Sequence, residues 1–437
     1  MNSNIEVFVE KLKSFDLDAM AKATGFVQRA DRGITPLNFL VTFFALMQEN
    51  EFGYENWALS YLSIYGDGPS KQAINKRVTP NCLDFVEALF AAVFEEALLK
   101  NSRIESTELF DSFNKVLIED STCLKVGSGL VEVFSGPRVN GKKVAQSRVQ
   151  LLWNMSTNFI ESVEMTPFSE NDVSYSSTIL EFIKEKDLII RDLGYWNIRV
   201  YSQIDVRGAY FVSRIKTNTR VKKLSGNDLC MYRWLNTLDR RGVSIASRDV
   251  LIGNNFKVRM IVEKLPETVA NERRKKNLRQ RNFKSRSLKN KAHYCLGWTI
   301  LITNVPSEIW SRTDVVKAYS LRWQIEIIFR SWKSQLPLAK LTAKGAGSAI
   351  HKPKTLIRLF MLYILLFLQP TYNFYFNKIK AIGRFVSPEK FIQLARRLPA
   401  LFLLQYNETI RRHLLRSACF DRRNDRKPLI ELIFRLF

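Results

Sequence analysis

Polar residues that each precede an apolar run of helical period mark the first part of the chain, residues 1–110. Thr35-Pro36 opens NFLVTFFALM, Ser70 precedes KQAINKRV, and Thr79-Pro80 opens LDFVEALFAAVFEEALL. Such residues begin helices because a side-chain oxygen accepts hydrogen bonds from the free N–H groups of the first turn. The pattern predicts a helical N-terminal region.

The helices expected after Ser70 and Thr79 follow each other closely and carry Lys71, Lys76 and Arg77. A consecutive helix pair with a basic face can act as a helix-turn-helix that docks on DNA. An ordinary packed helix pair with a solvated basic face has the same pattern. The sequence leaves both interpretations open, and residues 1–110 are a candidate DNA-binding region.

Short apolar runs of strand length replace the helical period after Phe113. NKVLIED, SRVQLLWNM and FIESVEMT are separated by turn-like clusters, and a helical stretch, SSTILEFIKEK, precedes the run DLII, which ends at Arg191-Asp192. Strands that alternate with a helix predict a mixed α/β core. Its first part covers residues 111–216. Its second part is expected in residues 312–372, where the helical period returns.

Residues 217–311, between these two parts, are predominantly of β character. VSIASRDVLI, FKVRMIVEKL and HYCLGWTILITN alternate or are β-branched, and Gly253-Asn254-Asn255 predicts a hairpin turn. We expect a separate β-rich insertion. It contains ten Lys or Arg between Arg273 and Lys291, which predicts a mobile or extended basic loop. Such a loop either binds DNA or is only a solvated linker.

The most apolar stretch, Leu359 to Leu368, is about half of the ~20 residues that cross a bilayer. We therefore expect a buried helix and no membrane partner. Residues 373–437 combine helical signals with many arginines and predict a helical C-terminal region.

The charge of the chain favours a polyanionic partner. Its 437 residues include 67 Lys and Arg against 42 Asp and Glu, a formal net charge of +25, so nucleic acid comes first and an anionic membrane surface second. Five cysteines without a CxxC pair, and only three histidines, fit neither a zinc site nor a disulfide framework. The N-terminus lacks the pattern of a secretory signal, so the sequence predicts a cytoplasmic protein.

The segment YSLRWQIEIIFRSWKSQL, which begins at Tyr319, carries the candidate chemistry. At the α-helical advance of about 100° per residue, Tyr319, Arg322, Glu326 and Lys333 lie within an arc of roughly 60°. The carboxylate on this stripe could hold Mg²⁺ while the cations and the phenol bind phosphate oxygens. An amphipathic helix with an Arg322–Glu326 ion pair is the simpler interpretation of the same spacing.

The order Tyr, two residues, Arg, three residues, Glu, six residues, Lys also resembles the signature of the insertion-sequence-four group of DDE transposases. Two further segments resemble the acidic blocks of that family: IEDSTCLKV places Asp120 after an apolar strand, and LIIRDLGYWN places Asp192 at the end of another. Each aspartate alone is a weak signal, because an isolated Asp at the end of a strand is more often a turn residue or a helix cap than a metal ligand. Their order, and the β-rich gap before Glu326, match the family.

The resemblance implies a ribonuclease H-like fold, with Asp120 on the first strand, Asp192 just after the fourth and Glu326 on a helix packed against the sheet. These carboxylates would be the catalytic residues. They would also hold two Mg²⁺ ions, for which Mn²⁺ can substitute. The phosphate contacts that it implies near the cleaved end are Tyr319, Arg322 and Lys333.

The activity implied by the resemblance is metal-dependent cut-and-paste transposition in the bacterial cytoplasm, at the nucleoid. A homodimer would cut double-stranded DNA with terminal inverted repeats, pass through hairpin ends and join the 3′-ends to target DNA. Trp298 would stack on a base flipped during hairpin formation, unless it is a buried tryptophan of the sheet. Two alternatives remain: an inactive DNA-binding relative or inhibitor, and a nuclease without strand transfer. The further DNA-binding candidates are Arg273, Arg274, Lys275 and Lys276.

Overall fold

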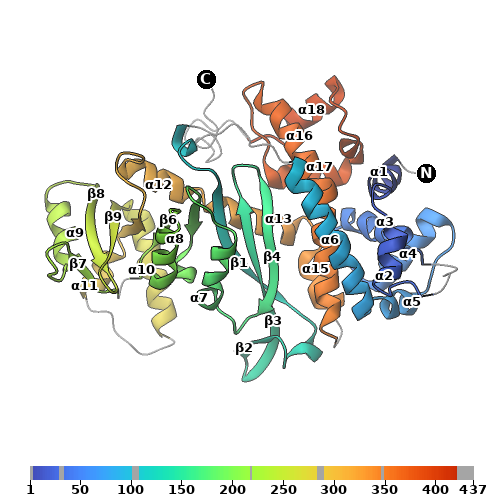
Figure 1. Ribbon diagram of the computed structural model, residues 1–437, viewed down its shortest axis with the longest axis horizontal. Coiled ribbons are helices and arrows are strands. Elements are labelled where there is room, and N and C mark those ends of the chain that lie inside the picture. The colour runs from blue at the N-terminus through green and yellow to red at the C-terminus, as the bar shows by residue number, and fades with distance from the viewer. Residues whose placement is uncertain are drawn as a thin grey trace.

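A mixed ten-stranded sheet runs through the computed structural model and has helices against its faces (Figure 1). The structure describes residues 3–28, 34–100, 108–216, 219–282, 290–345 and 349–420. The strand order is β2-β3-β1-β5-β6-β10-β9-β8-β7, and β4 also pairs with β3. The strands are β1 (Val116–Lys125), β2 (Ser135–Val139), β3 (Lys142–Asn154), β4 (Phe159–Pro167), β5 (Leu188–Arg191), β6 (Tyr210–Arg214), β7 (Val221–Lys223), β8 (Ile245–Ile252), β9 (Phe256–Lys264) and β10 (Trp298–Thr303).

The central strands confirm the mixed α/β core. Strand β3 is antiparallel to β1 and to β4, whereas β5 is parallel to both β1 and β6. The register aligns Ile118 with Ile190, and Ile190 with Val212. All three side chains lie in one core cluster, and their neighbours on the same strands, which point the other way, lie in a second. The central strands are therefore buried on both faces, as parallel strands usually are.

The segment expected as a helix before β5 is irregular instead. It forms α7 (Asp172–Tyr175) and the 3-10 helix η3 (Ser176–Glu181). Ser176 Oγ and Thr178 Oγ1 donate to the carbonyl oxygens of Val173 and Tyr175, at 2.7 and 2.8 Å. Side chains that bond to nearby carbonyl groups in this way compete with regular helical hydrogen bonds. A short 3-10 helix, η4 (Leu193–Tyr195), and then α8 (Ile198–Val206) follow β5.

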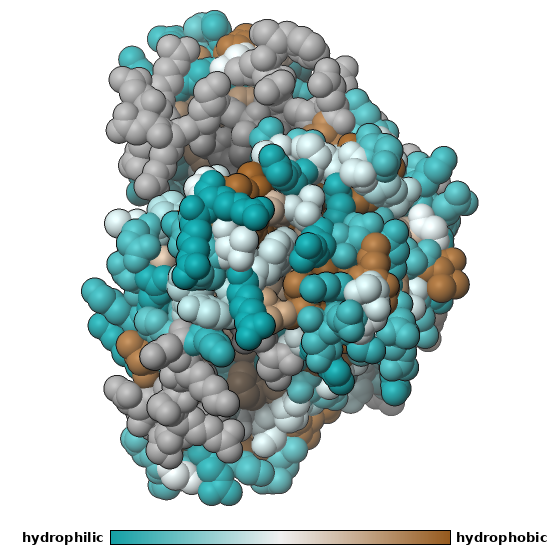
Figure 2. All heavy atoms as spheres, turned by 90° about the vertical axis from the view of Figure 1, so that its left-hand side faces the viewer, coloured by the Kyte–Doolittle hydropathy of each residue, from teal (hydrophilic) through white to brown (hydrophobic). Residues whose placement is uncertain are grey.

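The expected insertion is not a separate sheet, because β10 pairs antiparallel with β6 and joins β9, β8 and β7 to the core sheet. The hairpin turn between β8 and β9 is confirmed: Ile252 pairs with Phe256, and Gly253 and Asn255 have φ angles of +53° and +63°. The region also contains helices α9 (Met231–Arg240), α10 (Glu267–Asn282) and α11 (Asn290–Cys295). The outer end of the molecule that it forms is mostly hydrophilic (Figure 2).

The start of the basic segment is helical, so the prediction of a loop is wrong for Arg273 to Lys276. These residues lie in α10, which has no Gly or Pro between Glu267 and Asn282 and is rich in Arg, Lys and Glu, all good helix formers. The rest of the expected loop, residues 283–289, lies outside the described residues.

The helical N-terminal region is confirmed, and its expected caps are present. Thr35 Oγ1 accepts from Asn38 N at 3.1 Å, Ser70 Oγ accepts from Ala73 N at 3.3 Å, and Thr79 Oγ1 accepts from Cys82 N at 3.2 Å. The helices are α1 (Ser3–Leu12), α2 (Leu17–Ala23), α3 (Pro36–Gln48), α4 (Tyr54–Tyr65), α5 (Lys71–Arg77) and α6 (Pro80–Lys100).

After β10, helices α13, α14 and α15 lie between the sheet and the N-terminal region, with α15 beside α6, whereas α12 packs on β6, β8 and β9 (Figure 1). The run from His351 to Lys380 is long and apolar enough to cross a membrane by length and composition, but 78% of its most apolar window is buried inside the fold. The buried helix expected around Leu359 is thus present. The helices are α12 (Arg312–Ser320), α13 (Trp323–Ser334), α14 (Leu338–Gly345), α15 (His351–Tyr363), the π turn η5 (Ile364–Leu368), α16 (Gln369–Lys380), α17 (Pro388–Arg397) and α18 (Glu408–Ser417).

Candidate active site

The sheet brings the two predicted aspartates together. Asp120 lies within β1, Asp192 directly follows β5, and these parallel strands pair with Glu119 opposite Arg191. Because side chains alternate along a strand, Asp120 and Asp192 lie on the same face as Ile118 and Ile190. The two aspartates are therefore neighbours across two strands, although 71 residues separate them in sequence.

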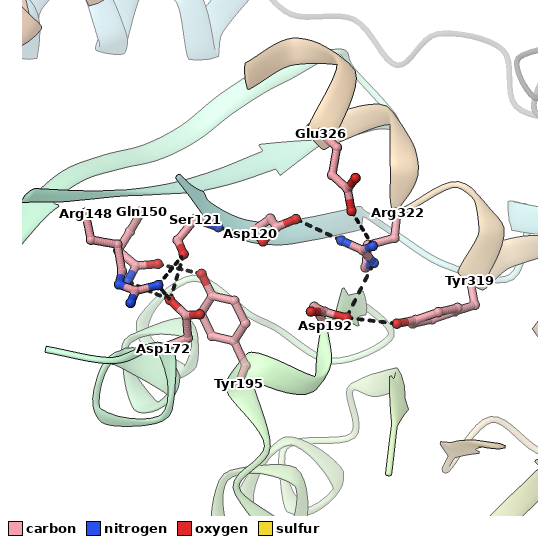
Figure 3. Close-up of polar contacts among 10 residues, drawn as sticks. All are labelled: Asp120, Ser121, Arg148, Gln150, Asp172, Asp192, Tyr195, Tyr319, Arg322 and Glu326. Carbon is pink, nitrogen blue, oxygen red and sulfur yellow. Dashed lines mark hydrogen bonds and ion pairs between the residues drawn. The ribbon is translucent and has the colours of Figure 1, made fainter. Parts of the chain in front are cut away.

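A single arginine joins all three predicted carboxylates (Figure 3). Arg322 Nη1 lies 2.8 Å from Asp120 Oδ2, Nη2 lies 2.5 Å from Glu326 Oε1, and Nε lies 3.8 Å from Asp192 Oδ1. The side chains of Asp120, Asp192 and Glu326 are 15%, 35% and 33% exposed. The three acids thus surround one guanidinium on a face of the sheet, near the end of β5, and are partly exposed. Among the described residues, no group of three or more His, Cys, Asp or Glu is arranged ready to hold a metal ion.

The polar residues expected along one helix are divided between two consecutive helices and the turn that joins them. Leu321 and Arg322 form a turn between α12 and α13, so Tyr319 belongs to the first helix and Glu326 to the second. The Tyr319 hydroxyl still donates to Asp192 Oδ1 at 3.3 Å. Lys333 points to the next part of β1, where its Nζ donates to Cys123 O at 3.0 Å and to the Thr122 hydroxyl at 2.5 Å.

Burial and mutual repulsion change the protonation of this cluster. The pKa of Asp120 is raised to about 7: burial is the main cause, the charges of Asp192 and Glu326 add to it, and Arg322 acts to lower it. Burial, followed by the charge of Asp192, holds the pKa of the Tyr319 phenol well above its usual value. Burial alone acts to lower the pKa of Arg322, but Asp192 and its other neighbours hold it above its usual value. Arg322 and Tyr319 therefore stay protonated near neutral pH, whereas Asp120 titrates there.

A second polar cluster, which the sequence did not reveal, lies directly beside Asp120. Asp172 Oδ1 accepts from Ser121 Oγ at 2.7 Å, Arg148 Nη1 at 3.0 Å and Gln150 Nε2 at 3.3 Å. The Tyr195 hydroxyl donates to Gln150 Oε1 at 2.5 Å, which links the cluster to the turn after Asp192. These contacts join β1, β3, α7 and η4 around the aspartates (Figure 3).

The structure does not bring every DNA-binding candidate to an accessible position. Trp298 is only 4% exposed and belongs to the second core cluster, so the alternative of a buried sheet tryptophan describes it and its role in stacking on a base is withdrawn. Trp323, which the sequence did not single out, is 46% exposed and directly follows Arg322. Arg330 lies 5.9 Å from its ring centroid. Trp323 is therefore an exposed aromatic side chain next in sequence to Arg322.

The four basic candidates on α10 have different environments. Arg273 and Arg274 are half-buried, and Lys275 and Lys276 are exposed. Arg274 Nη1 donates to Glu267 Oε1 at 2.7 Å, whereas Arg273 Nη1 reaches Thr299 Oγ1 on β10 at 3.4 Å. Arg273 thus points toward the sheet, and the lysines point to solvent.

Comparison with known families identifies the chain. The family model described as the transposase DDE domain matches residues 111–349. The chain belongs to this family. The matched range of this DDE transposase contains Asp120, Asp192 and Glu326.

The curated relatives are transposases of insertion sequences. The DDE transposase is 28% identical over 358 residues to the transposase of IS231B from Bacillus thuringiensis subsp. berliner, over 76% of this chain and 74% of the relative. It is 28% identical over 360 residues to the transposase of IS1151 from Clostridium perfringens, over 76% and 75% of the two chains. A piggyBac transposase synaptic complex with hairpin DNA aligns at 11% identity and a TM-score of 0.47, over 94% of this chain and 83% of that chain.

Proposed function

We propose that this DDE transposase cuts DNA at the ends of an insertion sequence and joins the 3′-ends to target DNA, with Asp120, Asp192 and Glu326 as the catalytic residues. The observation that carries the proposal is their convergence on Arg322 from two strands and a helix that are far apart in sequence. An isolated helix ion pair between Arg322 and Glu326 gives no reason for the two aspartates to meet it. The family match across all three acids supports the same conclusion.

The catalytic core is proposed to be ribonuclease H-like and to comprise residues 111–216 and 312–372. Support comes from five adjacent strands in the order β4-β3-β1-β5-β6, in which β3 alone runs opposite to its neighbours. Asp120 is on the first of these strands in sequence, Asp192 follows the fourth, and Glu326 is on a helix against the sheet. Residues 217–311 then extend the core, with helical regions before and after it.

The donor set fits divalent magnesium, with manganese as a substitute. Carboxylate oxygens without His or Cys are the ligands that hard cations prefer. Asp120, Asp192 and Glu326 are drawn together by one guanidinium, so three acidic side chains share a single internal cation. This excess of negative charge at a partly exposed site favours added cations. Two such ions would supply charge relief to the attacking and leaving oxygens of the phosphodiester.

The cations around the acids are suited to hold the DNA strand. Arg322 donates one hydrogen bond to Asp120 and one to Glu326. Phosphate oxygens accept from the same guanidinium N–H groups, so a bound phosphate can take over contacts that the carboxylates now make. Tyr319 keeps its proton because its pKa is raised, and it can donate to a phosphate oxygen. Lys333 adds positive charge further along β1, where its Nζ donates to Cys123 O at 3.0 Å.

A homodimer acting on paired terminal inverted repeats in the bacterial cytoplasm, through hairpin intermediates, completes the proposal. The net charge of +25 supports DNA as the partner. The helix pair α5 and α6, with Lys71 and Lys76, supports a DNA-binding N-terminal region.

The test is cleavage and joining by wild type beside Asp120→Ala, Asp192→Ala and Glu326→Ala. A supercoiled plasmid carrying the element's ends is incubated with Mg²⁺ and protein, and pre-cut ends test joining separately. We expect each variant to lose at least about a thousandfold in both rates while binding the ends. Asp228→Ala, which removes only the exposed ion pair with Arg220, is the control. Normal cleavage by any of the three variants would overturn the assignment, and cleavage by wild type without joining would make the protein a nuclease.

A further inference from the structure

Arg214 lies in the same row of side chains across the sheet as Asp120 and Asp192, one strand beyond Asp192. Ile118, Ile190 and Val212 are aligned across β1, β5 and β6 and lie in the same core cluster. Two positions further along the parallel strands, the next row on that face is Asp120, Asp192 and Arg214. Arg214 therefore lies next to Asp192, on the side away from Asp120.

A second arginine reaches the same part of the sheet from α10. Arg214 pairs with Leu301 of β10, and Thr299 lies two positions from Leu301, on the same face. Arg273 donates to Thr299 Oγ1 at 3.4 Å. Burial and the nearby charge of Arg214 lower the pKa of Arg273, as expected of two cations that repel each other at short range.

Tyr319, whose hydroxyl donates to Asp192 Oδ1 at 3.3 Å, lies near both arginines and connects them to the candidate active site. The charge of Arg214 opposes the rise in the pKa of Tyr319, which burial and Asp192 cause. Tyr319 in turn acts to raise the pKa of Arg273, against the effects of burial and Arg214. The two guanidinium groups and the Tyr319 phenol therefore form one cluster beside Asp192.

The carboxylates of Asp192 and Glu263 lie near the two guanidinium groups of this cluster but form no ion pair with them among the described residues. No ion pair of Arg214 or Arg273 is found there, and Arg214 makes no side-chain hydrogen bond among those residues. Glu263 is the carboxylate whose charge acts on Arg273. Burial raises the pKa of Glu263, and the charge of Arg273 acts to lower it. Two half-buried, mutually repelling cations are unfavourable unless an anion joins them.

We propose that Arg214 and Arg273 form a binding site for a DNA backbone phosphate, next to the one that is cut. The site rests on the proposed function, because it is adjacent to Asp192. Paired guanidinium groups suit phosphate since each can donate two parallel hydrogen bonds to its oxygens. The phosphate belongs either to the end of the element or to the target DNA, and these sources have the same chemistry.

The test compares wild type with Arg214→Gln, Arg273→Gln and the double variant, as full chains. Binding of end DNA is measured in EDTA over a range of salt concentrations, and capture of target DNA is measured with pre-cut ends. We expect either affinity to fall about tenfold per variant, with a salt slope reduced by about one unit. A fall in end binding assigns the phosphate to the element, and a fall in target capture alone assigns it to the target.

Two controls separate this site from a general loss of charge or of folding. Arg220→Gln removes an exposed arginine that is already paired with Asp228, and it should leave both affinities unchanged. Removing a repelling cation should leave the thermal midpoint unchanged or higher. If a glutamine variant fails to fold, Arg214→Lys and Arg273→Lys keep the charge but lose the two-pronged geometry, and they should weaken binding by a smaller factor.

The result that overturns the site is wild-type affinity and salt slope in both arms for the double variant. The proposed function fails separately, if Glu326→Ala still cuts DNA. Loss of cutting in Glu326→Ala together with unchanged binding by the double variant would thus remove the phosphate site alone.

Discussion

At the scale of single residues, Arg322 explains how three acids can share a small space. One guanidinium neutralises about one of three negative charges, so the remaining repulsion and the burial act on the least exposed acid, Asp120. Its pKa of about 7 means that the cluster gains or loses a proton near neutral pH. A divalent cation competes with that proton, because a carboxylate must be ionised to be a ligand.

The raised pKa of Asp120 predicts a particular pH dependence of stability in the metal-free protein. The unfolded chain releases this proton near 3.8, and the folded protein releases it near 7. The stabilisation is therefore complete below the lower value and is lost as pH rises through the higher one. Between about pH 5 and about pH 8, wild type should lose on the order of 2 kcal/mol more free energy of unfolding than Asp120→Asn. Urea unfolding in EDTA measures the difference.

The control for this experiment is Asp228→Asn, which changes an exposed aspartate whose pKa is lowered by a hydrogen bond from Arg220. It should keep the pH dependence of wild type. Equal loss of stability in wild type and Asp120→Asn over the same range would contradict a buried, proton-holding Asp120.

Residue identity and spacing were enough to find the acids but not every cation near them. Asp120, Asp192, Glu326, Tyr319 and Arg322 meet as the resemblance implied. Arg214 carries no local signal, since it is one of 67 Lys and Arg and its position depends on the register of two strands. The prediction that Trp298 stacks on a base was wrong for a similar reason. Exposure is decided by packing between distant segments, which a single tryptophan in an apolar run does not reveal.

At the scale of elements, helix caps were predictable because they depend on neighbouring residues. Thr35, Ser70 and Thr79 each accept the expected hydrogen bond. The errors occurred where local hydrogen bonds or intrinsic propensity competed with the broad pattern. Ser176 and Thr178 divert the segment before β5 into a 3-10 helix, and a run of charged helix formers makes α10 a helix where charge alone suggested a loop.

The turn η4 after Asp192 offers a prediction about how the elements are held. A Cβ added at Gly194 would lie 2.6 Å from Asp172 Oδ2 and 3.4 Å from Asp172 Cβ. Asp172 cannot turn away freely, because Ser121, Arg148 and Gln150 all donate to its other oxygen. Gly194→Ala should therefore displace the turn that carries Asp192, with slower single-turnover cleavage and a higher half-saturating Mg²⁺ concentration.

Asp172→Ala makes room for the added methyl group, so the two changes should not be additive. We expect Gly194→Ala to slow cleavage much less in the Asp172→Ala background, with a coupling of about 1 kcal/mol. Gly53→Ala is the matched control, since nothing lies within 4 Å of its added Cβ. Additive effects of the two substitutions on rate and on Mg²⁺ dependence would show that Asp172 does not position the turn.

At the scale of the whole molecule, the sheet is continuous from β4 to β7 and includes the region expected as a separate insertion. The sequence indicated that this region is rich in strands. Its place in the sheet depends on the pairing of β6 with β10, in which Arg214 pairs with Leu301, 87 positions later in the sequence. Because the sheet is continuous, β10 and β6 hold helix α10 at a fixed place relative to Asp192. Basic residues on α10 can therefore act on DNA at the proposed active site.

The charge of the whole molecule predicts how DNA binding responds to salt. Each cation that neutralises a phosphate releases counterions, so the logarithm of affinity should fall linearly with the logarithm of salt concentration, with a slope of roughly −0.9 per contact.

Lys275 and Lys276 are exposed on α10 and are not in ion pairs among the described residues. Replacing both with alanine should reduce the slope by one to two units, as measured by titration of end DNA at several salt concentrations. Lys13→Ala, which removes a lysine already paired with Glu10 at 2.7 Å, should leave the slope unchanged. An unchanged slope in the α10 variant would mean that the outer face of this helix does not contact the DNA backbone, and it would confine the role of α10 to the inward-pointing Arg273.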